Sequence, residues 1–162
     1  TAPQRHAHAL PGQGSLLLMP AWQPGGRLGV KLVTVVPDNR EHGLPSVHAL
    51  YVLMDAGTGA PLALLDGEAL TLRRTAAVSA LASSLLSRPD SKTLLVVGNG
   101  RLAPEMAVAH CSVRDIRQVL VWGRDAARVE AAMIRMREGD LPDSIALAAS
   151  ASLPQACAQA SK

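Results

Sequence analysis

Aromatic residues are almost absent from this 162-residue chain, which has no Phe, one Tyr and two Trp. A hydrophobic core must therefore come from Leu, Val, Ala, Ile and Met, and single-stranded nucleic acid would find few rings to stack on. The net charge is only +3, and the basic residues are scattered along the chain. No run of them marks a nucleic-acid-binding arm, so we expect no nucleic-acid partner.

Cysteines and long apolar runs are equally scarce. Cys111 and Cys157 are the two cysteines, far apart and outside any CxxC spacing, so neither a disulfide framework nor a metal site is indicated. This usage is typical of a reducing, cytoplasmic setting. No stretch reaches the roughly 18 to 20 apolar residues of a membrane span, and the N-terminus lacks an apolar segment of signal-peptide type. We expect a soluble protein without a membrane partner.

The chain has enough apolar residues for a globular core, at 48% of the total, and its first half is rich in strand patterns. Short apolar runs alternate with Gly, Pro and Asp and predict strands at 15–22, 28–37, 46–55 and 61–67. The last two are joined by a glycine-containing connection, residues 56–60, suited to a hairpin. An antiparallel or mixed sheet is expected.

A long helix is predicted over residues 68–90, where Leu70, Ala77, Leu81 and Leu85 recur at helical spacing before Pro89. Beyond it, strands and helices alternate, which is typical of βαβ units and a parallel sheet. The predicted strands are 92–97, 117–122 and 144–149, and the predicted helices are about 101–112, 125–138 and 152–160. The fold class is α/β, with one region over 1–90 and a second over 91–162.

A glycine pattern lies between the first of these later strands and its helix. Gly98, Gly100 and Ala103 match G-x-G-x-x-A, in which glycines let a pyrophosphate approach backbone N–H groups at a helix N-terminus. The preceding strand, the following helix and the second strand supply the context that dinucleotide binding requires. The alternative is a tight structural turn.

The end of the second strand bears on the choice of cofactor. An acidic residue there holds the ribose 2′-hydroxyl of NAD, whereas this chain has Gly123 and Arg124. A guanidinium suits the 2′-phosphate of NADP because its fork of donors matches phosphate. Asp125 keeps NAD possible, and Arg124 could equally be an exposed arginine opening a helix.

Other polar residues stand in apolar surroundings. Lys31 lies among strand residues, where it either contacts a substrate anion or occupies a solvated face of the sheet. Arg73 and Arg74 are adjacent in the predicted helix and point about 100° apart, so one of them could face an anion. His6 and His8 could share a face, but nothing nearby completes a metal site, and we predict none.

Several blocks of the chain together carry a family resemblance. In order they are "PQR", "LLLMPAW", "GVK" followed by "PDN", "DAGTGAPLALLDG", "TLRRTAA", "VVGNGRLA" and "VLVWGR". From about residue 3 to residue 138 the chain resembles the ornithine cyclodeaminase/μ-crystallin family. The resemblance implies a mixed-sheet substrate-binding and dimerisation domain followed by a Rossmann NAD(P)-binding domain, here incomplete.

The resemblance also implies an activity. Members transfer hydride at the α-carbon of amino or imino acids. We expect NAD(P)H-dependent reduction of cyclic α-imino acids such as Δ1-pyrroline-2-carboxylate and Δ1-piperideine-2-carboxylate, with NADP(H) favoured and NAD(H) possible. The alternatives are cyclisation of L-ornithine to L-proline and ammonia, and a non-catalytic, crystallin-like NADP-binding protein. A homodimer is expected.

Residue roles follow from the resemblance by position. Arg5, Lys31 and Arg74 would converge on the substrate carboxylate, with Lys31 and Arg74 as the catalytic pair and Met19 walling the substrate site. Lys31 would also polarise or protonate the imine. The cofactor would contact Thr75 and a set of loop residues, namely Gly98, Asn99, Gly100, Arg101, Leu102, Ala103, Gly123 and Arg124.

Three departures from the family pattern accompany these expectations. The chain has Asn99 where the family often has Ala and Leu102 where it usually has Gln, so the loop is expected to hold its cofactor differently. It lacks the helical segment that normally precedes "PQR". It also ends after about half a Rossmann domain, without the later strands and the catalytic aspartate of cyclodeaminases. We therefore expect a fragment, inactive by itself.

Overall fold

The computed structural model describes residues 1–161 and divides into two compact units, Thr1–Thr71 and Leu72–Lys162. The division falls inside helix α1 (Gly67–Leu86). The sequence predicts a domain boundary between residues 90 and 91, and this boundary stays a prediction. Within residues 1–161, no helix combines the length and apolar character needed to cross a membrane.

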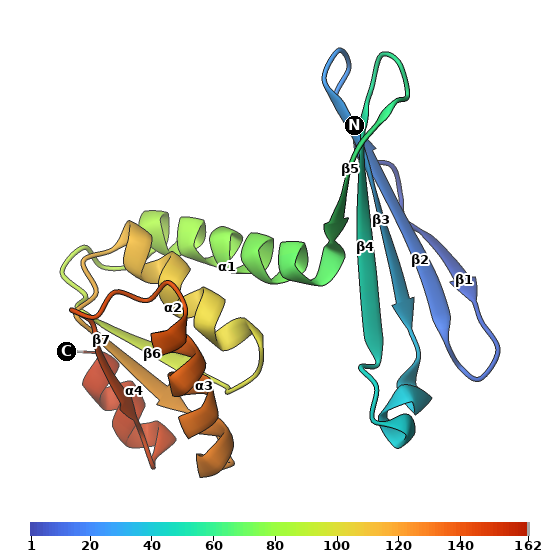
Figure 1. Cartoon of the computed structure of the whole chain (residues 1–162). Coiled ribbons are helices and arrows are strands. Elements are labelled where there is room, and N and C mark those ends of the chain that lie inside the picture. The colour runs from blue at the N-terminus through green and yellow to red at the C-terminus, as the bar shows by residue number, and fades with distance from the viewer. Residues whose placement is uncertain (162) are drawn as a thin grey trace. The chain divides into compact units, whose positions relative to one another are not determined.

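The first unit is a five-stranded sheet whose strands follow the chain order β1-β2-β3-β4-β5 (Figure 1). Its strands are β1 (His6–Ala9), β2 (Ser15–Trp22), β3 (Arg27–Val35), β4 (Val47–Asp55) and β5 (Pro61–Asp66). A 3-10 helix, η1 (Pro37–His42), joins β3 to β4. All four pairings are antiparallel. In the described residues this sheet is therefore antiparallel and not mixed, because hairpin connections reverse the chain at every step.

The alternating pattern of the strands puts two sets of side chains on opposite faces of this sheet. Opposite partners in the register are Met19 and Lys31, then Lys31 and Tyr51, then Tyr51 and Leu65. These four side chains form a row across β2 to β5 on one face. Residues one position along, such as Leu32 and Leu50, belong to the other face.

Helix α1 begins where the carboxylate of Asp66 caps it. Asp66 Oδ1 accepts hydrogen bonds from the backbone N–H groups of Glu68 at 2.7 Å and Ala69 at 3.1 Å. The helix ends at Leu86 and not at residue 90, since Pro89 disfavours helical backbone before it. The buried hydrophobic residues of α1 are Ala76 and Ala80. Leu81 and Leu85, whose spacing helped to predict the helix, are exposed, and Leu70 is half-buried.

The second unit contains a parallel sheet in the order β6-β7-β8 (Figure 1). Its elements are β6 (Thr93–Val97), α2 (Leu102–Val113), β7 (Gln118–Trp122), α3 (Ala126–Glu138), β8 (Ala146–Ala149) and α4 (Leu153–Ala160). Every strand and helix expected here is present, with bounds within two residues of those predicted. The core gathers apolar side chains from the sheet, α2 and α3, including Ala107, Val119, Val121 and Met136.

Candidate functional site

The glycine loop joins β6 to α2 at the carboxyl end of the parallel sheet. Gly98 has a φ of +128°, a backbone conformation that residues with a Cβ rarely adopt. A Cβ placed on Gly98 or Gly100 would meet no other heavy atom within 4 Å. The loop therefore presents bare backbone on its open side, as a cradle for phosphate must.

The helix behind the loop starts without a side-chain cap. Its N-cap residue is Arg101, whose side chain makes no capping hydrogen bond. At α3, by contrast, Asp125 caps the helix by accepting a hydrogen bond from Arg128 N at 3.2 Å. At the same place in α2, Ala103 N donates to Gly100 O at 3.2 Å and Pro104 has no N–H. The N–H that this helix start can offer to a phosphate is therefore that of Leu102. Ala103 is buried at 5% exposure, which explains the small third residue of the motif.

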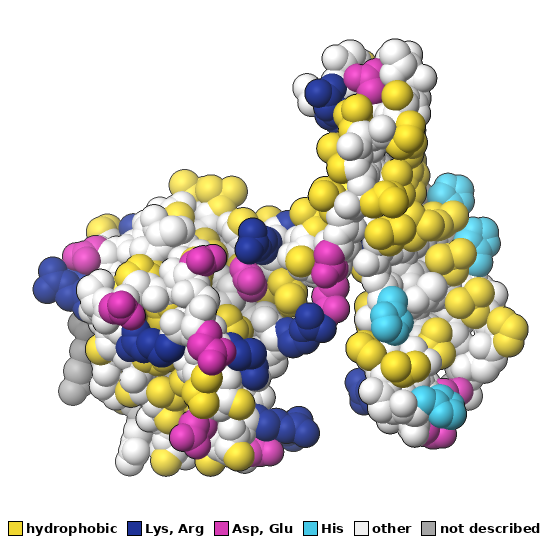
Figure 2. All heavy atoms as spheres, in the orientation of Figure 1, with side chains coloured by type: hydrophobic (Ala, Val, Ile, Leu, Met, Phe, Trp, Pro, Cys, Tyr) yellow, Lys and Arg dark blue, Asp and Glu magenta, His cyan; other side chains and the backbone are white. Residues whose placement is uncertain are grey.

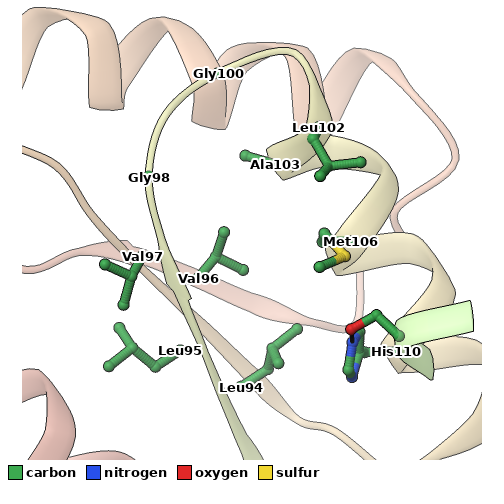
Figure 3. A pocket seen from close by; sticks show the side chains of 11 residues that line it. Leu94, Leu95, Val96, Val97, Gly98, Gly100, Leu102, Ala103, Met106 and His110 are labelled. Carbon is green, nitrogen blue, oxygen red and sulfur yellow. Dashed lines mark hydrogen bonds between the residues drawn. The ribbon is translucent and has the colours of Figure 1, made fainter. Parts of the chain in front are cut away.

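A pocket of about 340 Å³ lies against β6 and the start of α2 (Figure 3). Its walls are mostly apolar and come from β6, the loop and α2, with Ser79 of α1 at one end. Ser79 Oγ and His110 Nε2 are 3.1 Å apart. Burial lowers the pKa of His110, which favours the neutral imidazole. The pocket thus offers an apolar wall beside the glycine loop, closed at one end by a neutral polar pair.

The loop is tied to the end of β7. A Cβ on Gly123 would lie 2.5 Å from Asn99 Nδ2 and 2.9 Å from Val129 Cγ2, so a larger residue there would require these side chains to shift. Asn99 Nδ2 also donates to Asp125 O at 3.4 Å. Arg124 is exposed. Asn99, one of the departures from the family pattern, thus connects the glycine loop to the segment that precedes α3.

Lys31 of the first unit is half-buried, which is neither the fully solvated position nor the deep burial considered from sequence. Its Nζ donates to the hydroxyl of Thr71 in α1, and that hydroxyl donates to Gly67 O at 2.6 Å. Met19 lies directly opposite Lys31 in β2 and is half-buried too. Met19 and Lys31 are therefore neighbours in the sheet, and their common role in a substrate site stays a prediction.

The remaining predicted residues lie on different parts of the chain. Arg5 is exposed just before β1. Arg73 and Arg74 are both exposed in α1, and Thr75 is half-buried. The convergence of Arg5, Lys31 and Arg74 on one carboxylate stays a prediction, since Arg74 belongs to the second unit. Among residues 1–161, no group of three His, Cys, Asp or Glu side chains is placed to hold a metal.

Three residues escaped the sequence reasoning. The sequence predicts no role for Thr71, which accepts a hydrogen bond from Lys31. It also predicts none for Ser79 and His110, which lie together at one end of the pocket. A usable signal is present for the α1 residues, because Thr71, Thr75 and Ser79 recur every four positions on one helix face. His110 offers no such signal, since its partner comes from another helix.

A parallel sheet whose first strand runs into a glycine loop and then a helix is the arrangement of a Rossmann-type fold, in which dinucleotides lie at this loop. Residues 1–161 match the family model of the ornithine cyclodeaminase/mu-crystallin family. The chain belongs to this family, which confirms the resemblance seen in the sequence.

Two relatives illustrate how much of the family's length is present. An uncharacterized protein of Schizosaccharomyces pombe is 59% identical over 107 residues, 66% of this chain and 32% of its own. The Delta(1)-pyrroline-2-carboxylate reductase of Colwellia psychrerythraea is 44% identical over 133 residues, 78% of this chain and 42% of its own. The chain thus spans less than half the length of these relatives.

Solved structures give the same picture. The Delta(1)-pyrroline-2-carboxylate reductase of Thermococcus litoralis, in complex with NADH and L-proline, has a TM-score of 0.80 and 33% identity, covering 96% of this chain and 48% of that one. A lysine cyclodeaminase that recognises L-lysine and L-ornithine has a TM-score of 0.73 and 34% identity, covering 92% and 43%. An archaeal alanine dehydrogenase dimer with bound NAD has a TM-score of 0.80 and 28% identity, covering 96% and 47%.

Proposed function

We propose that the protein carrying this chain reduces cyclic α-imino acids with a reduced nicotinamide cofactor. The observation that carries the proposal is the match along 96% of the chain to a reductase whose structure holds NADH and L-proline. L-Proline is the product expected when Δ1-pyrroline-2-carboxylate gains a hydride and a proton. The proposal covers substrates with a five-membered pyrroline ring and with a six-membered piperideine ring.

The cofactor is proposed to bind at the glycine loop. Gly98 N donates to Trp122 O at 2.7 Å and Ala103 N to Gly100 O at 3.2 Å, so the N–H groups between them, up to Leu102 at the start of α2, are proposed to meet the pyrophosphate. Thr75 is proposed to lie beside the phosphates. NADP(H) is favoured over NAD(H) because Arg124 follows β7, and Asp125 already caps α3. Related structures hold NADH and NAD, so both cofactors belong in the test.

The reaction adds a hydride to the imine carbon and a proton to the imine nitrogen. The bound nicotinamide supplies the hydride. Lys31 is proposed to supply the proton from Nζ, whose direction is set by the Thr71 hydroxyl. Arg5 and Arg74 are proposed to bind the substrate carboxylate, for which a guanidinium offers paired donors. Met19, opposite Lys31, is proposed to line the substrate site.

The test mixes the whole protein with NADPH or NADH and with Δ1-pyrroline-2-carboxylate or Δ1-piperideine-2-carboxylate. Oxidation of the cofactor is measured as the fall in absorbance of the reduced nicotinamide. Oxidation that depends on the imino acid supports the proposal. Nucleotide binding without any turnover would favour the non-catalytic, crystallin-like alternative instead.

A second candidate is cyclisation of L-ornithine to L-proline with loss of ammonia. The observation that favours it is the likeness to a lysine cyclodeaminase that recognises L-ornithine, at 34% identity. Ammonia release from L-ornithine with no net change in cofactor would support it, and imine-dependent oxidation without ammonia would exclude it as the main activity.

We also propose a homodimer in the cytoplasm. Figure 2 shows hydrophobic side chains at the surface of the five-stranded unit. Leu64 and Leu62 of β5 are 68% and 49% exposed. Such a surface suits contact with a second copy, and a related alanine dehydrogenase is a dimer. Free Cys111 and Cys157 fit a reducing compartment. Light scattering of the whole protein tests the dimer.

A further inference from the structure

A cleft of about 300 Å³ separates the glycine loop from one face of α3. The loop side is formed by Asn99, Gly100 and Arg101, and the helix side by Arg128, Ala131 and Arg135. Residues at this spacing share one helix face, so the two arginines flank a small alanine that leaves room between them. Three guanidinium-bearing residues thus line one cleft, and none of its lining residues is acidic.

The contacts of Arg128 and Arg135 leave donors for a further acceptor. Arg128 Nε lies 3.5 Å from Asp125 Oδ2, and its side chain is 78% exposed. Arg135 Nη2 donates to Asn99 O at 3.2 Å. Each guanidinium carries five N–H donors in a fixed fork, so one such contact each does not exhaust them. The cleft suits an anion with several acceptor oxygens, such as a phosphate.

The position of the cleft indicates which phosphate it would hold. In a Rossmann fold the pyrophosphate lies on the glycine loop, and the adenosine ribose lies past the end of the second strand. Arg128 is in the first turn of α3, directly after that strand. Arg101 is in the loop itself. The space between them is where a group on the ribose 2′-oxygen would reach.

We infer that Arg101 and Arg128 bind the 2′-phosphate of NADP(H), an inference that rests on the proposed nucleotide binding. A phosphomonoester carries a charge of about −1.5 to −2 near pH 7, which two guanidinium groups can balance. Arg135 lies two turns along α3 and is assigned a different role. Through Asn99 O it positions the glycine loop, and it therefore affects both cofactors.

The experiment measures dissociation constants of NADPH and NADH for the whole protein and the variants Arg101→Ala, Arg128→Ala and Arg128→Gln. Each variant is expected to weaken NADPH by about tenfold to a hundredfold, the range for hydrogen bonds to charged groups, and NADH by less than about twofold. The matched control is Arg117→Ala. This variant removes an exposed arginine at the amino end of β7, the opposite end of the strand from the glycine loop. It should change neither constant.

Competition identifies the group that is bound. Adenosine 2′,5′-bisphosphate should displace NADPH far better than 5′-AMP from the native protein, and this advantage should fall by about tenfold or more in Arg128→Ala. If inorganic phosphate alone competes equally well, the cleft is a general anion site and the assignment is wrong. Equal weakening of both dinucleotides by Arg101→Ala and Arg128→Ala would also overturn it.

Separate binding measurements test the role of Arg135 and the proposed function. Arg135→Ala should weaken NADPH and NADH alike, and Arg135→Lys, which keeps a donor toward Asn99 O, should restore much of the loss. A selective effect on NADPH would contradict the positioning role. Failure of the native protein to bind either dinucleotide would defeat the proposed function itself, whereas binding without the expected selectivity in the variants defeats only the arginine assignment.

Discussion

Lys31 of β3 donates a hydrogen bond to the hydroxyl of Thr71, which lies in the first turn and a half of α1. The same hydroxyl donates to Gly67 O at 2.6 Å, one helical turn earlier. The ammonium group is therefore directed by a hydroxyl whose own position is fixed by the helix backbone. This relationship gives Lys31 a defined orientation in a half-buried place, which a proton donor requires.

Replacing Lys31 by Met is expected to lower kcat/KM for imine reduction by about 100-fold to 10,000-fold, the range for loss of a general acid. The aliphatic stem remains, so the dissociation constant of the nucleotide should stay the same. Steady-state kinetics and a binding titration measure the two quantities. Near-normal turnover would mean that Lys31 is only a polar residue of the sheet face.

Replacing Arg124 by Ala is expected to weaken NADPH more than NADH, because we propose that this exposed guanidinium binds the 2′-phosphate, which NADH lacks. Titration of each nucleotide against native protein and variant measures the difference. Equal effects on the two nucleotides would remove Arg124 from the neighbourhood of that phosphate.

Replacing Gly98 by Ala should weaken both nucleotides by more than tenfold and reduce stability by about 1 to 3 kcal/mol. The φ of +128° strains any residue with a Cβ, and the new methyl group would stand on the open side of the loop. Gly43→Ala is the control, since Gly43 also has a positive φ of 69° but follows η1, away from the loop. It should lower stability without changing nucleotide affinity.

Arg114 caps the end of α1. Its guanidinium donates to the carbonyl oxygens of Ser83 at 2.7 Å, Ser84 at 3.0 Å and Ser87 at 2.9 Å. Arg114→Met should lower the free energy of unfolding by about 2 to 4 kcal/mol, because these carbonyls lose a charged donor. Chemical denaturation checks this. Arg88→Met, which removes a surface ion pair with Asp90, should have little effect.

His110 should make stability depend on pH. Burial lowers the pKa of its imidazole in the folded protein, so the unfolded chain takes up a proton at higher pH than the folded one. The stability from this group is present above the unfolded pKa of about 6.5 and declines as pH falls below it. Urea denaturation across this range should show a shallower dependence in His110→Gln than in the native protein.

Much of the fold could be predicted because the strands and helices differ in the period of their apolar residues. The parallel half agrees within two residues at each end, since turn signals such as Gly98 and Gly139 stand between the elements. Strand β1 and η1 were not predicted. The four residues of β1 alternate His and Ala, and they form a strand because β2 offers an unpaired edge, which is a tertiary effect.

The candidate site could be predicted from the sequence only where its residues are consecutive in the chain. The glycine loop lies in consecutive residues, so its pattern was readable. Thr71 beside Lys31 was not, because the partners are 40 positions apart and meet only when α1 starts against the sheet. Arg128 and Arg135 were overlooked for a similar reason, since an exposed arginine in a helix becomes informative only once the loop facing it is known.

In the proposed reaction, hydride passes from the nicotinamide to the imine carbon. The most direct measurement uses NADPH deuterated at the transferable position with Δ1-pyrroline-2-carboxylate, followed by mass and NMR analysis of the proline formed by the whole protein. One deuterium is expected at the α-carbon of L-proline. Proline that carries no deuterium there, or no proline at all, would contradict it.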